Sequence, residues 1–480
     1  MIIEKGKLAE YLIKIYDFGY STEKKSRKPE DEIMTMFADQ LKSKIIDRIE
    51  FLYDEANYLI IEENYVEPEW KTMIAKHYIN SAYSTTLHQS VIRIHFLIEK
   101  EFSQNSYLGF ITLRPLEEIE IALSFVYVNW LQSFFSDEHT FVMTYAKEVH
   151  YMGNSVTIQT YPFFAQDSIV TCCADANVIM LKKFFANKFK ISSTEKNSFP
   201  VSKLSREHKV PKRIESLLMK TMLTDADIPY RTQRFRNSEV IEKNQWLRIE
   251  KQINAYLESG LPVILGIDGH VVQLIGYNKS IDNCITSYIV YDDSGHLEKL
   301  NFEQFDEKKR HFTYQLSMQE IKKYCENNIN TSFFLIFSEH ERVYIDYERY
   351  TFFLIEYLLQ LYKLDKNDRT SIICRVFEED GKINSNVSFR TMLVDNSVLK
   401  EFLLSNIIPE QEKIISNLLK KGLPHYLWYT EITIEGESFC LCADPTMYYN
   451  TRDIEKLFFD LGPIGLMDNK SLRLLIQSIQ

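Results

Sequence analysis

Two neighbouring cysteines, Cys172 and Cys173, occur where a helix is expected to begin, over residues 173–188. Gln166 precedes them by six and seven residues. A helix N-terminus carries unpaired N–H groups and a partial positive charge, so it stabilises a thiolate placed there. The same N–H groups can bind a developing oxyanion, and a glutamine amide just upstream can supply a second donor. This spacing is typical of a thiol nucleophile beside an oxyanion site.

A base and a carboxylate follow later in the chain. His270 opens an aliphatic strand expected over residues 270–277. Asp292 and Asp293 come directly after the next expected strand, over residues 287–291. The linker between these strands is short, so we expect them to be neighbours in a sheet. Asp292, or Asp293 in its place, would then orient the imidazole of His270, and the imidazole would pair with the thiol.

Each of these features has a structural explanation when it stands alone. A cysteine at a helix start is often a small buried residue, a histidine beside a strand is often a satisfied core group, and an Asp-Asp-Ser-Gly run commonly forms a turn. The occurrence of all of them in one order is what favours a catalytic site. Cys440 and Cys442 alternate on a strand, which favours core packing over metal binding. We therefore expect no metal and no cofactor.

The chain holds, in this order, a glutamine, a cysteine at a helix start, a histidine before an aliphatic strand and an aspartate. This order resembles that of the papain-like cysteine peptidases. Within that superfamily it is most similar to the bacteriocin-processing leader peptidases of ABC exporters and their stand-alone relatives. The resemblance covers about residues 105–300. The family's Gln-to-Cys spacing of six favours Cys172 as the nucleophile. The residues that follow the family's cysteine favour Cys173 instead, because they are matched from there by Ala174, Ala176 and Met180. We take Cys173 as the nucleophile and keep Cys172 as the alternative.

The resemblance implies an α+β, papain-like fold in which the cysteine helix packs on a later antiparallel sheet that carries His270 and Asp292. At about 150 residues per domain, a chain of 480 residues allows roughly three domains. We expect a papain-like catalytic domain at 105–340, with an N-terminal helical and mixed region at 1–104 and a C-terminal α/β domain at 341–480.

The C-terminal region repeats one pattern of the catalytic region. Residues 250–262 and 412–424 both read as a helix that ends in Gly-Leu-Pro, and strands follow each of them. The later copy also reaches an aspartate, Asp444, but Ile432 stands at the position that matches His270. The region is either a degenerate second copy that lacks the catalytic histidine or a chance recurrence of one helix–turn–strand unit.

The resemblance implies a cysteine-nucleophile hydrolase that cleaves a peptide or isopeptide bond through a thioester. Cys173 would attack the carbonyl, His270 would carry the proton, and Asp292 would orient the imidazole. Gln166 and the backbone N–H of Cys173 would bind the oxyanion. Two alternatives stay open: a papain-fold acyltransferase, deamidase or transglutaminase with the same triad, and a non-catalytic binding protein on a decayed peptidase fold.

Composition and charge limit the classes of binding partner and the cellular compartment that we expect. The net charge of −11 argues against a general nucleic-acid binder, although residues 182–220 hold eleven Lys and Arg against three Glu. Residues 1–7 turn charged too early for a secretory leader, and no run of about 18 apolar residues predicts a membrane span. Seven cysteines without a framework spacing fit a reducing compartment. We expect a cytoplasmic protein whose partner is a protein or peptide substrate; the oligomeric state is open.

Overall fold

The fold is described from a computed structural model of the chain. The described residues form a mixed α+β protein with several antiparallel sheets, which confirms the α+β class expected from the sequence. No helix among these residues is long and apolar enough to cross a membrane. The structure describes residues 2–8, 10–12, 45, 50–76, 91–114, 120–128, 140–166, 173–189, 219–220, 223–224, 226–235, 242–280, 284–293, 309–310, 313–327, 333–364, 372–378, 381–405, 420, 423–446 and 458–462.

The chain divides into two compact units, and each is described by itself. Unit 1 combines Met1–Val240 with Ile264–Ile336, and unit 2 combines Ile241–Val263 with Phe337–Gln480. All the residues expected to carry chemistry fall in unit 1. The expected three-part division of the chain stays a prediction.

The first sheet of unit 1 runs, within the described residues, in the order β1-β2-β3-β4-β6-β9-β8, with β5 beside β4. Neighbouring strands are antiparallel throughout. Its strands are rich in β-branched and aromatic residues, which favour the extended conformation. The strands are β1 (Ile2–Glu4), β2 (Tyr58–Tyr65), β3 (Val91–Leu97), β4 (Tyr107–Arg114), β5 (Glu120–Ile121), β6 (Ser124–Tyr127), β8 (Tyr145–Tyr151) and β9 (Asn154–Phe163). The helical segments that accompany them are η1 (Lys5–Lys7), α3 (Glu50–Glu55) and α4 (Pro68–Lys76).

The second sheet lies almost entirely in unit 1 and runs in the order β10-β16-β11-β12-β13-β15-β14, with β7 beside β12. The close approach of β7 needs a glycine, because a Cβ added at Gly276 of β12 would lie 2.1 Å from the carbonyl oxygen of Phe141. The strands are β7 (Thr140–Val142), β10 (Tyr230–Phe235), β11 (Val263–Ile267), β12 (His270–Lys279), β13 (Ile285–Tyr291), β14 (Lys309–Arg310), β15 (Thr313–Leu316) and β16 (Phe333–Ser338), and helix α12 (Met318–Asn327) joins the last two.

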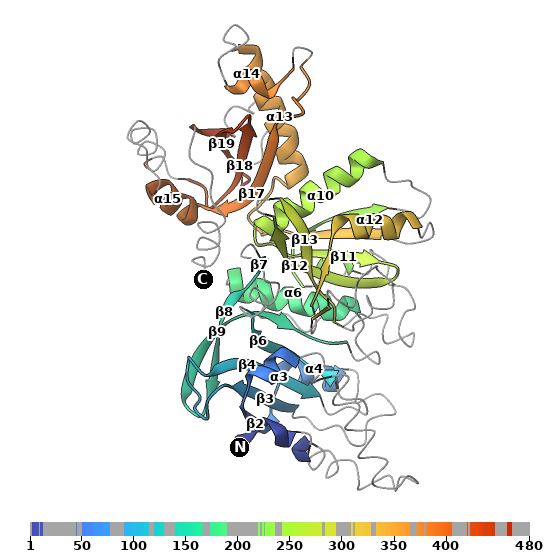
Figure 1. The fold of residues 1–480 in the computed structure, drawn as a ribbon, viewed down its shortest axis with the longest axis vertical. Helices are drawn as coiled ribbons and strands as arrows, with labels where there is room; N and C mark the ends of the chain where they lie inside the picture. The colour runs from blue at the N-terminus through green and yellow to red at the C-terminus, as the bar shows by residue number, and fades with distance from the viewer. Residues whose placement is uncertain are drawn as a thin grey trace. The chain divides into compact units, whose positions relative to one another are not determined.

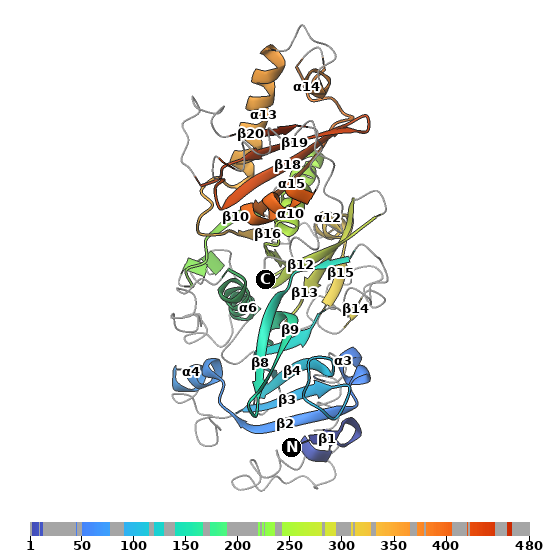
Figure 2. The same cartoon turned by 90° about the vertical axis from the view of Figure 1, so that its left-hand side faces the viewer.

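Helix α6 (Cys173–Phe189) packs on β12 of the second sheet and on β8 and β9 of the first. In Figure 1 it lies next to β12, and in Figure 2 it is seen close to end-on. Alanine, methionine, leucine and lysine make its sequence a good helix former. Its buried residues occupy all sides of the helix, which is typical of a central helix rather than a surface one. The expected cysteine helix is therefore present and lies against antiparallel strands.

Unit 2 is built on the antiparallel sheet β17-β18-β19-β20. Trp428 of β18 is central to its core: its indole N–H donates to the carbonyl of Ile345 at 2.7 Å, and the ring of Tyr350 stacks on it at 5.4 Å. The strands are β17 (Ser388–Asp395), β18 (Tyr426–Ile434), β19 (Glu437–Ala443) and β20 (Phe458–Gly462). The helices of this unit are α10 (Lys243–Glu258), α13 (Tyr347–Leu364), α14 (Ile372–Val376) and α15 (Asn396–Ser405).

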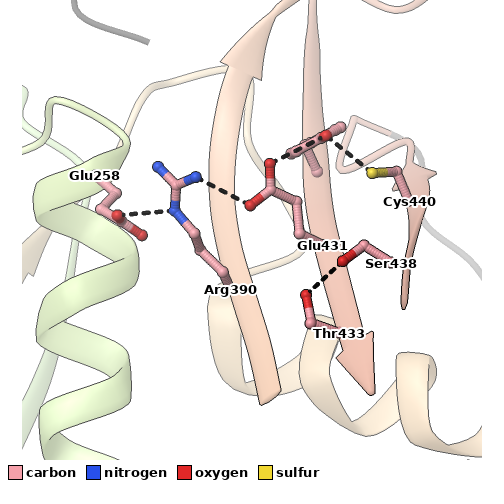
Figure 3. A network of polar contacts seen from close by, with 7 residues as sticks. Glu258, Arg390, Glu431, Thr433, Ser438 and Cys440 are labelled. Atoms are coloured by element: carbon pink, nitrogen blue, oxygen red, sulfur yellow. Dashed lines mark hydrogen bonds and ion pairs between the residues drawn. The ribbon is translucent and has the colours of Figure 1, made fainter. Parts of the chain in front are cut away.

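A polar network joins α10 to this sheet (Figure 3). Arg390 of β17 donates to Glu258 of α10 at 3.0 Å and to Glu431 of β18 at 2.9 Å. Both glutamates are buried, so the guanidinium is the cation that allows two carboxylates to remain in the interior. The network continues through the hydroxyl of Tyr429, which contacts Glu431 at 3.3 Å and the sulfur of Cys440 at 3.0 Å.

The residues of the suspected C-terminal repeat have structural environments of their own. Cys440 and Cys442 are both buried on β19, in agreement with the core-packing role predicted for them. Ile432 is buried within β18, and the Asp444 carboxylate accepts a turn hydrogen bond from the Thr446 N–H at 2.8 Å. The helix expected within 412–419 lies outside the described residues, so the duplication stays a hypothesis.

Candidate active site

Cys173 is the first residue of α6 and lies in the interior of unit 1. Its thiol is free of any disulfide, and the residue is 5% exposed. This position places the sulfur at the positive end of the helix, next to N–H groups that have no partner within the helix. Cys172, the alternative nucleophile, lies outside the described residues.

A tight turn places His270 at the start of β12. Asp268 and Gly269 connect β11 to β12, and both have a positive φ, 48° and 78°. Two consecutive left-handed residues are the pattern of a type I′ hairpin turn, in which glycine is favoured because it has no Cβ. The imidazole that follows is buried at 4% exposure.

The pairing of β12 with β13 brings a carboxylate to that imidazole. The strands are antiparallel, and Gln273 lies opposite Tyr291. The residue after Tyr291 therefore lies at the end of the sheet where β12 begins. Nε2 of His270 and Oδ1 of Asp292 are 2.8 Å apart, and Asp292 is 2% exposed. The bond is thus shielded from water.

Opposing effects act on the protonation of His270. Burial by itself lowers the pKa of the imidazole, because the interior disfavours the charged ring. The charge and hydrogen bond of Asp292 raise the pKa, and so do a hydrogen bond and the charge of Cys173. The partners outweigh the burial, and the pKa of His270 lies well above its usual 6.5. The site is therefore arranged to hold an imidazolium.

The thiol, the imidazole and the carboxylate form one chain of contacts. The proximity of Cys173 raises the pKa of the His270 imidazole, and Nε2 of His270 is joined to Asp292 at 2.8 Å. Because Nε2 faces the carboxylate, Nδ1 is the ring nitrogen on the side away from Asp292. Such a chain can move the thiol proton to the ring and stabilise the ion pair that results.

Comparison with known proteins adds no relative to this site. A scan against models of protein families finds no match to the chain, and a search of curated proteins finds none either. Function is therefore inferred from the chemistry of the buried residues.

Gln166 follows β9, a strand that packs against α6. A buried arginine holds the backbone just before it: Nη2 of Arg114 donates to the carbonyl of Ala165 at 2.5 Å. The N–H of Ala165 in turn donates to the carbonyl of Ile121 at 3.0 Å. The chain between Gln166 and Cys173 lies outside the described residues, so the oxyanion role of Gln166 stays a prediction.

Asp293 lies beside the His270–Asp292 pair. It is fully buried, and one donor atom from each of these three residues lies within 4.8 Å of the other two. An imidazole with two carboxylates is a donor set that several divalent cations accept. The 2.8 Å contact with the ring is made by Asp292, so Asp293 is a neighbour of the pair and a candidate cation ligand.

The basic stretch at 182–220 is described only over 182–189 and at residues 219 and 220. Three of its four described lysines are buried or paired within the fold. Lys182 is 7% exposed, Lys183 forms an ion pair with Glu69 of α4, and Lys188 lies over the ring of Phe184 at 5.2 Å. Burial lowers the pKa of Lys188 to about 8. The described part of the stretch therefore offers no open row of cations to a nucleic acid.

Sequence reasoning missed two buried amides beside the candidate residues Cys173 and His270. Asn177 of α6 and Gln273 of β12 are both fully buried and hydrogen-bonded to backbone. The available signal was the polar residue itself, because each interrupts an otherwise apolar run. A buried polar side chain in such a run needs partners, and these partners lie at the candidate site.

Proposed function

We propose that the protein is a cysteine-nucleophile hydrolase with a papain-like arrangement, acting on a peptide or isopeptide bond. The observation that carries the proposal is the buried chain from Cys173 through His270 to Asp292. A core cysteine and a core histidine rarely need one another as partners, whereas a thiol nucleophile needs a base that a third group orients.

The reaction begins when the Cys173 thiol gives its proton to His270 and the sulfur attacks the carbonyl carbon. A C–S bond forms, and the electron pair of the C=O bond moves to the oxygen. The N–H groups at the start of α6, together with Gln166, would bind that oxyanion. On collapse the C–N bond breaks, His270 returns the proton to the leaving amine, and a thioester remains.

Water then completes hydrolysis. His270 removes a proton from the water, and the hydroxide attacks the thioester. The C–S bond then breaks, and His270 returns the proton to the sulfur, which leaves a carboxylic acid and the free thiol. If an amine attacks the thioester in place of water, the outcome is acyl transfer or transglutamination. If the acyl donor is a glutamine side chain and water is the acceptor, the outcome is deamidation. The acceptor decides the outcome, not the triad.

An electrophilic peptide tests the proposal. The protein is incubated with a panel of peptidyl vinyl sulfones, and the modified residue is mapped by mass spectrometry. We expect one adduct on Cys173, lost in Cys173→Ser and in His270→Ala. Labelling of Cys173 that persists in His270→Ala would contradict the proposal, and so would labelling spread equally over the other cysteines.

The cluster of His270, Asp292 and Asp293 makes a metal-dependent hydrolase the second candidate. A chelator separates the two. The thiol route uses side chains only, so labelling should be unchanged after EDTA, whereas a metal-dependent reaction would be lost with EDTA and restored by the cation. Product masses from a peptide library then identify hydrolysis, transfer or deamidation.

A further inference from the structure

Asn177 connects the cysteine helix to the histidine strand. Its Nδ2 donates one hydrogen bond to the carbonyl of Cys173 at 2.7 Å and another to the carbonyl of Val271 at 2.8 Å. The first partner is the proposed nucleophile, and the second is the residue directly after the proposed base. One buried NH₂ group therefore ties together the backbones that carry the thiol and the imidazole.

We propose that Asn177 is the positioning residue that keeps the Cys173 thiol within hydrogen-bonding reach of His270. The inference rests on the proposed thiol chemistry, since without it the distance between the two groups has no functional meaning. The bridge acts on the backbones and touches no substrate. Proton transfer between the thiol and the ring is sensitive to shifts of a fraction of an ångström, so a rigid link near both groups has a direct effect on rate.

The orientation of the Asn177 amide follows from its surroundings. Both groups that face Nδ2 are carbonyl oxygens, which accept and do not donate. Only the NH₂ end can therefore point towards them. Oδ1 is buried and has no hydrogen-bond partner within the described part of the chain. A buried acceptor without a hydrogen bond lowers the free energy of unfolding. Asn177 therefore stands at a position where an apolar side chain would avoid this cost.

A second amide supports the first. Nε2 of Gln273 donates to the backbone carbonyl of Asn177 at 2.5 Å, and the hydroxyl of Tyr161 donates to Oε1 of Gln273 at 2.5 Å. Tyr161 belongs to β9, so strands of both sheets and α6 meet in this network. All three side chains are fully buried. The helix turn that begins at Cys173 is thus held from two directions.

The test uses two variants of Asn177 that separate its bond to Cys173 from its bond to Val271. Asn177→Ser keeps a hydroxyl that can bond the carbonyl of Cys173, which lies one helical turn before it, but cannot reach Val271. Asn177→Leu removes both bonds. Asn187→Ser is the matched control, because Asn187 lies on the same helix and its Nδ2 donates to the carbonyl of Lys183 at 2.6 Å, again one turn before. Among the described residues, no second hydrogen bond joins this side chain to a strand.

The readout is the rate of Cys173 alkylation by iodoacetamide from pH 5 to pH 9, mapped by mass spectrometry, beside a melting curve. We expect Asn177→Ser to lower the rate at pH 6 by about tenfold or more while the rate at pH 9 stays close to that of the wild type. A purely structural role would lower the melting temperature and leave the shape of the pH profile unchanged. Asn187→Ser should keep the wild-type profile.

A folded Asn177→Ser with the wild-type profile overturns the inference. If Asn177→Leu does not fold, Asn177→Ser alone decides the matter, because it retains the bond within the helix. Failure of the proposed function is recognised separately. In that case wild type and His270→Ala share one profile, whereas failure of the positioning role leaves that pair different and makes Asn177→Ser equal to the wild type.

Discussion

Replacing Asp292 with asparagine removes one charge from the candidate site and little else. The side chains have nearly the same size, and an asparagine oxygen can still accept from Nε2 of His270. What disappears is the buried carboxylate 2.8 Å from the ring, which offsets the cost of burying an imidazolium. We expect the pKa of His270 to fall in Asp292→Asn, because burial continues to lower it and the largest opposing charge is gone.

The size of the effect follows from the difference between a hydrogen bond to a carboxylate and one to a neutral amide. Hydrogen bonds to charged groups are worth about 1.5–3 kcal/mol and neutral ones about 0.5–1.5 kcal/mol, so about 1–1.5 kcal/mol is lost, and 1.36 kcal/mol is a factor of ten. The equilibrium constant that sets the population of the thiolate–imidazolium pair should therefore fall about 5- to 13-fold in Asp292→Asn. The alkylation rate of Cys173 at pH 6 reports this population directly.

Stability gives a second measure with a definite sign. The pKa of His270 is higher in the folded protein than in the unfolded chain, where it is about 6.5. The contribution of His270 to the free energy of unfolding is therefore fully present below a pH of about 6.5 and is lost as the pH rises through the pKa of the folded state. Wild type and Asp292→Asn should therefore differ more in unfolding free energy at pH 6 than at pH 9.

Asp395→Asn is the control for this exchange. Asp395 also contacts a histidine, His425, at 3.3 Å, but that imidazole is half exposed and belongs to unit 2. Asparagine at this position still caps α15, so the fold is retained. Equal Cys173 rates at pH 6 in wild type and Asp292→Asn would refute the reasoning, as would an equally large effect of Asp395→Asn.

Three further predictions follow from the fold. Arg390→Met should lower the unfolding free energy, measured by urea denaturation, by about 3 kcal/mol, because it removes the guanidinium that pairs with two buried glutamates. Arg375→Met, which removes an exposed ion pair, should change the unfolding free energy little. Gly269→Ala and Gly153→Ala should each lower the unfolding free energy by about 1–2 kcal/mol, because both glycines have a positive φ. Only Gly269→Ala should slow the alkylation of Cys173, because its turn carries His270. Equal alkylation rates in the two variants would contradict this. Burial, with the charge of Arg342, lowers the pKa of His340 to about 4, so stability should fall as the pH drops from about 6.5 towards 4, and His340→Asn should flatten that dependence in melting curves.

Local signals in the sequence were enough to predict the elements that carry the candidate triad. The aliphatic run after His270 is β12, and the run before Asp292 is β13. Their short connection makes them antiparallel neighbours, and this pairing alone brings the carboxylate to the imidazole. The helix after Cys173 follows from its composition in the same way. These contacts depend on chain connectivity and on the alternation of side chains, both of which can be read locally.

Contacts between distant segments could not be read in that way. Asn177 and Val271 are 94 positions apart, and their bond exists only because α6 packs on β12 at one particular height. The bond from Arg114 to Ala165 likewise depends on how β4 and the segment after β9 come together. Nothing in the local pattern sets such a register, because it results from the packing of whole elements.

Activation of Cys173 by His270 is tested most directly by the alkylation of two cysteines in one sample. Cys284 is exposed and Cys173 is buried, so burial alone would make Cys173 the slower of the two. We predict that at pH 6 Cys173 reacts faster with iodoacetamide than Cys284, and that this order reverses in His270→Ala. A wild-type protein in which Cys284 reacts first, with no change in His270→Ala, would contradict the account.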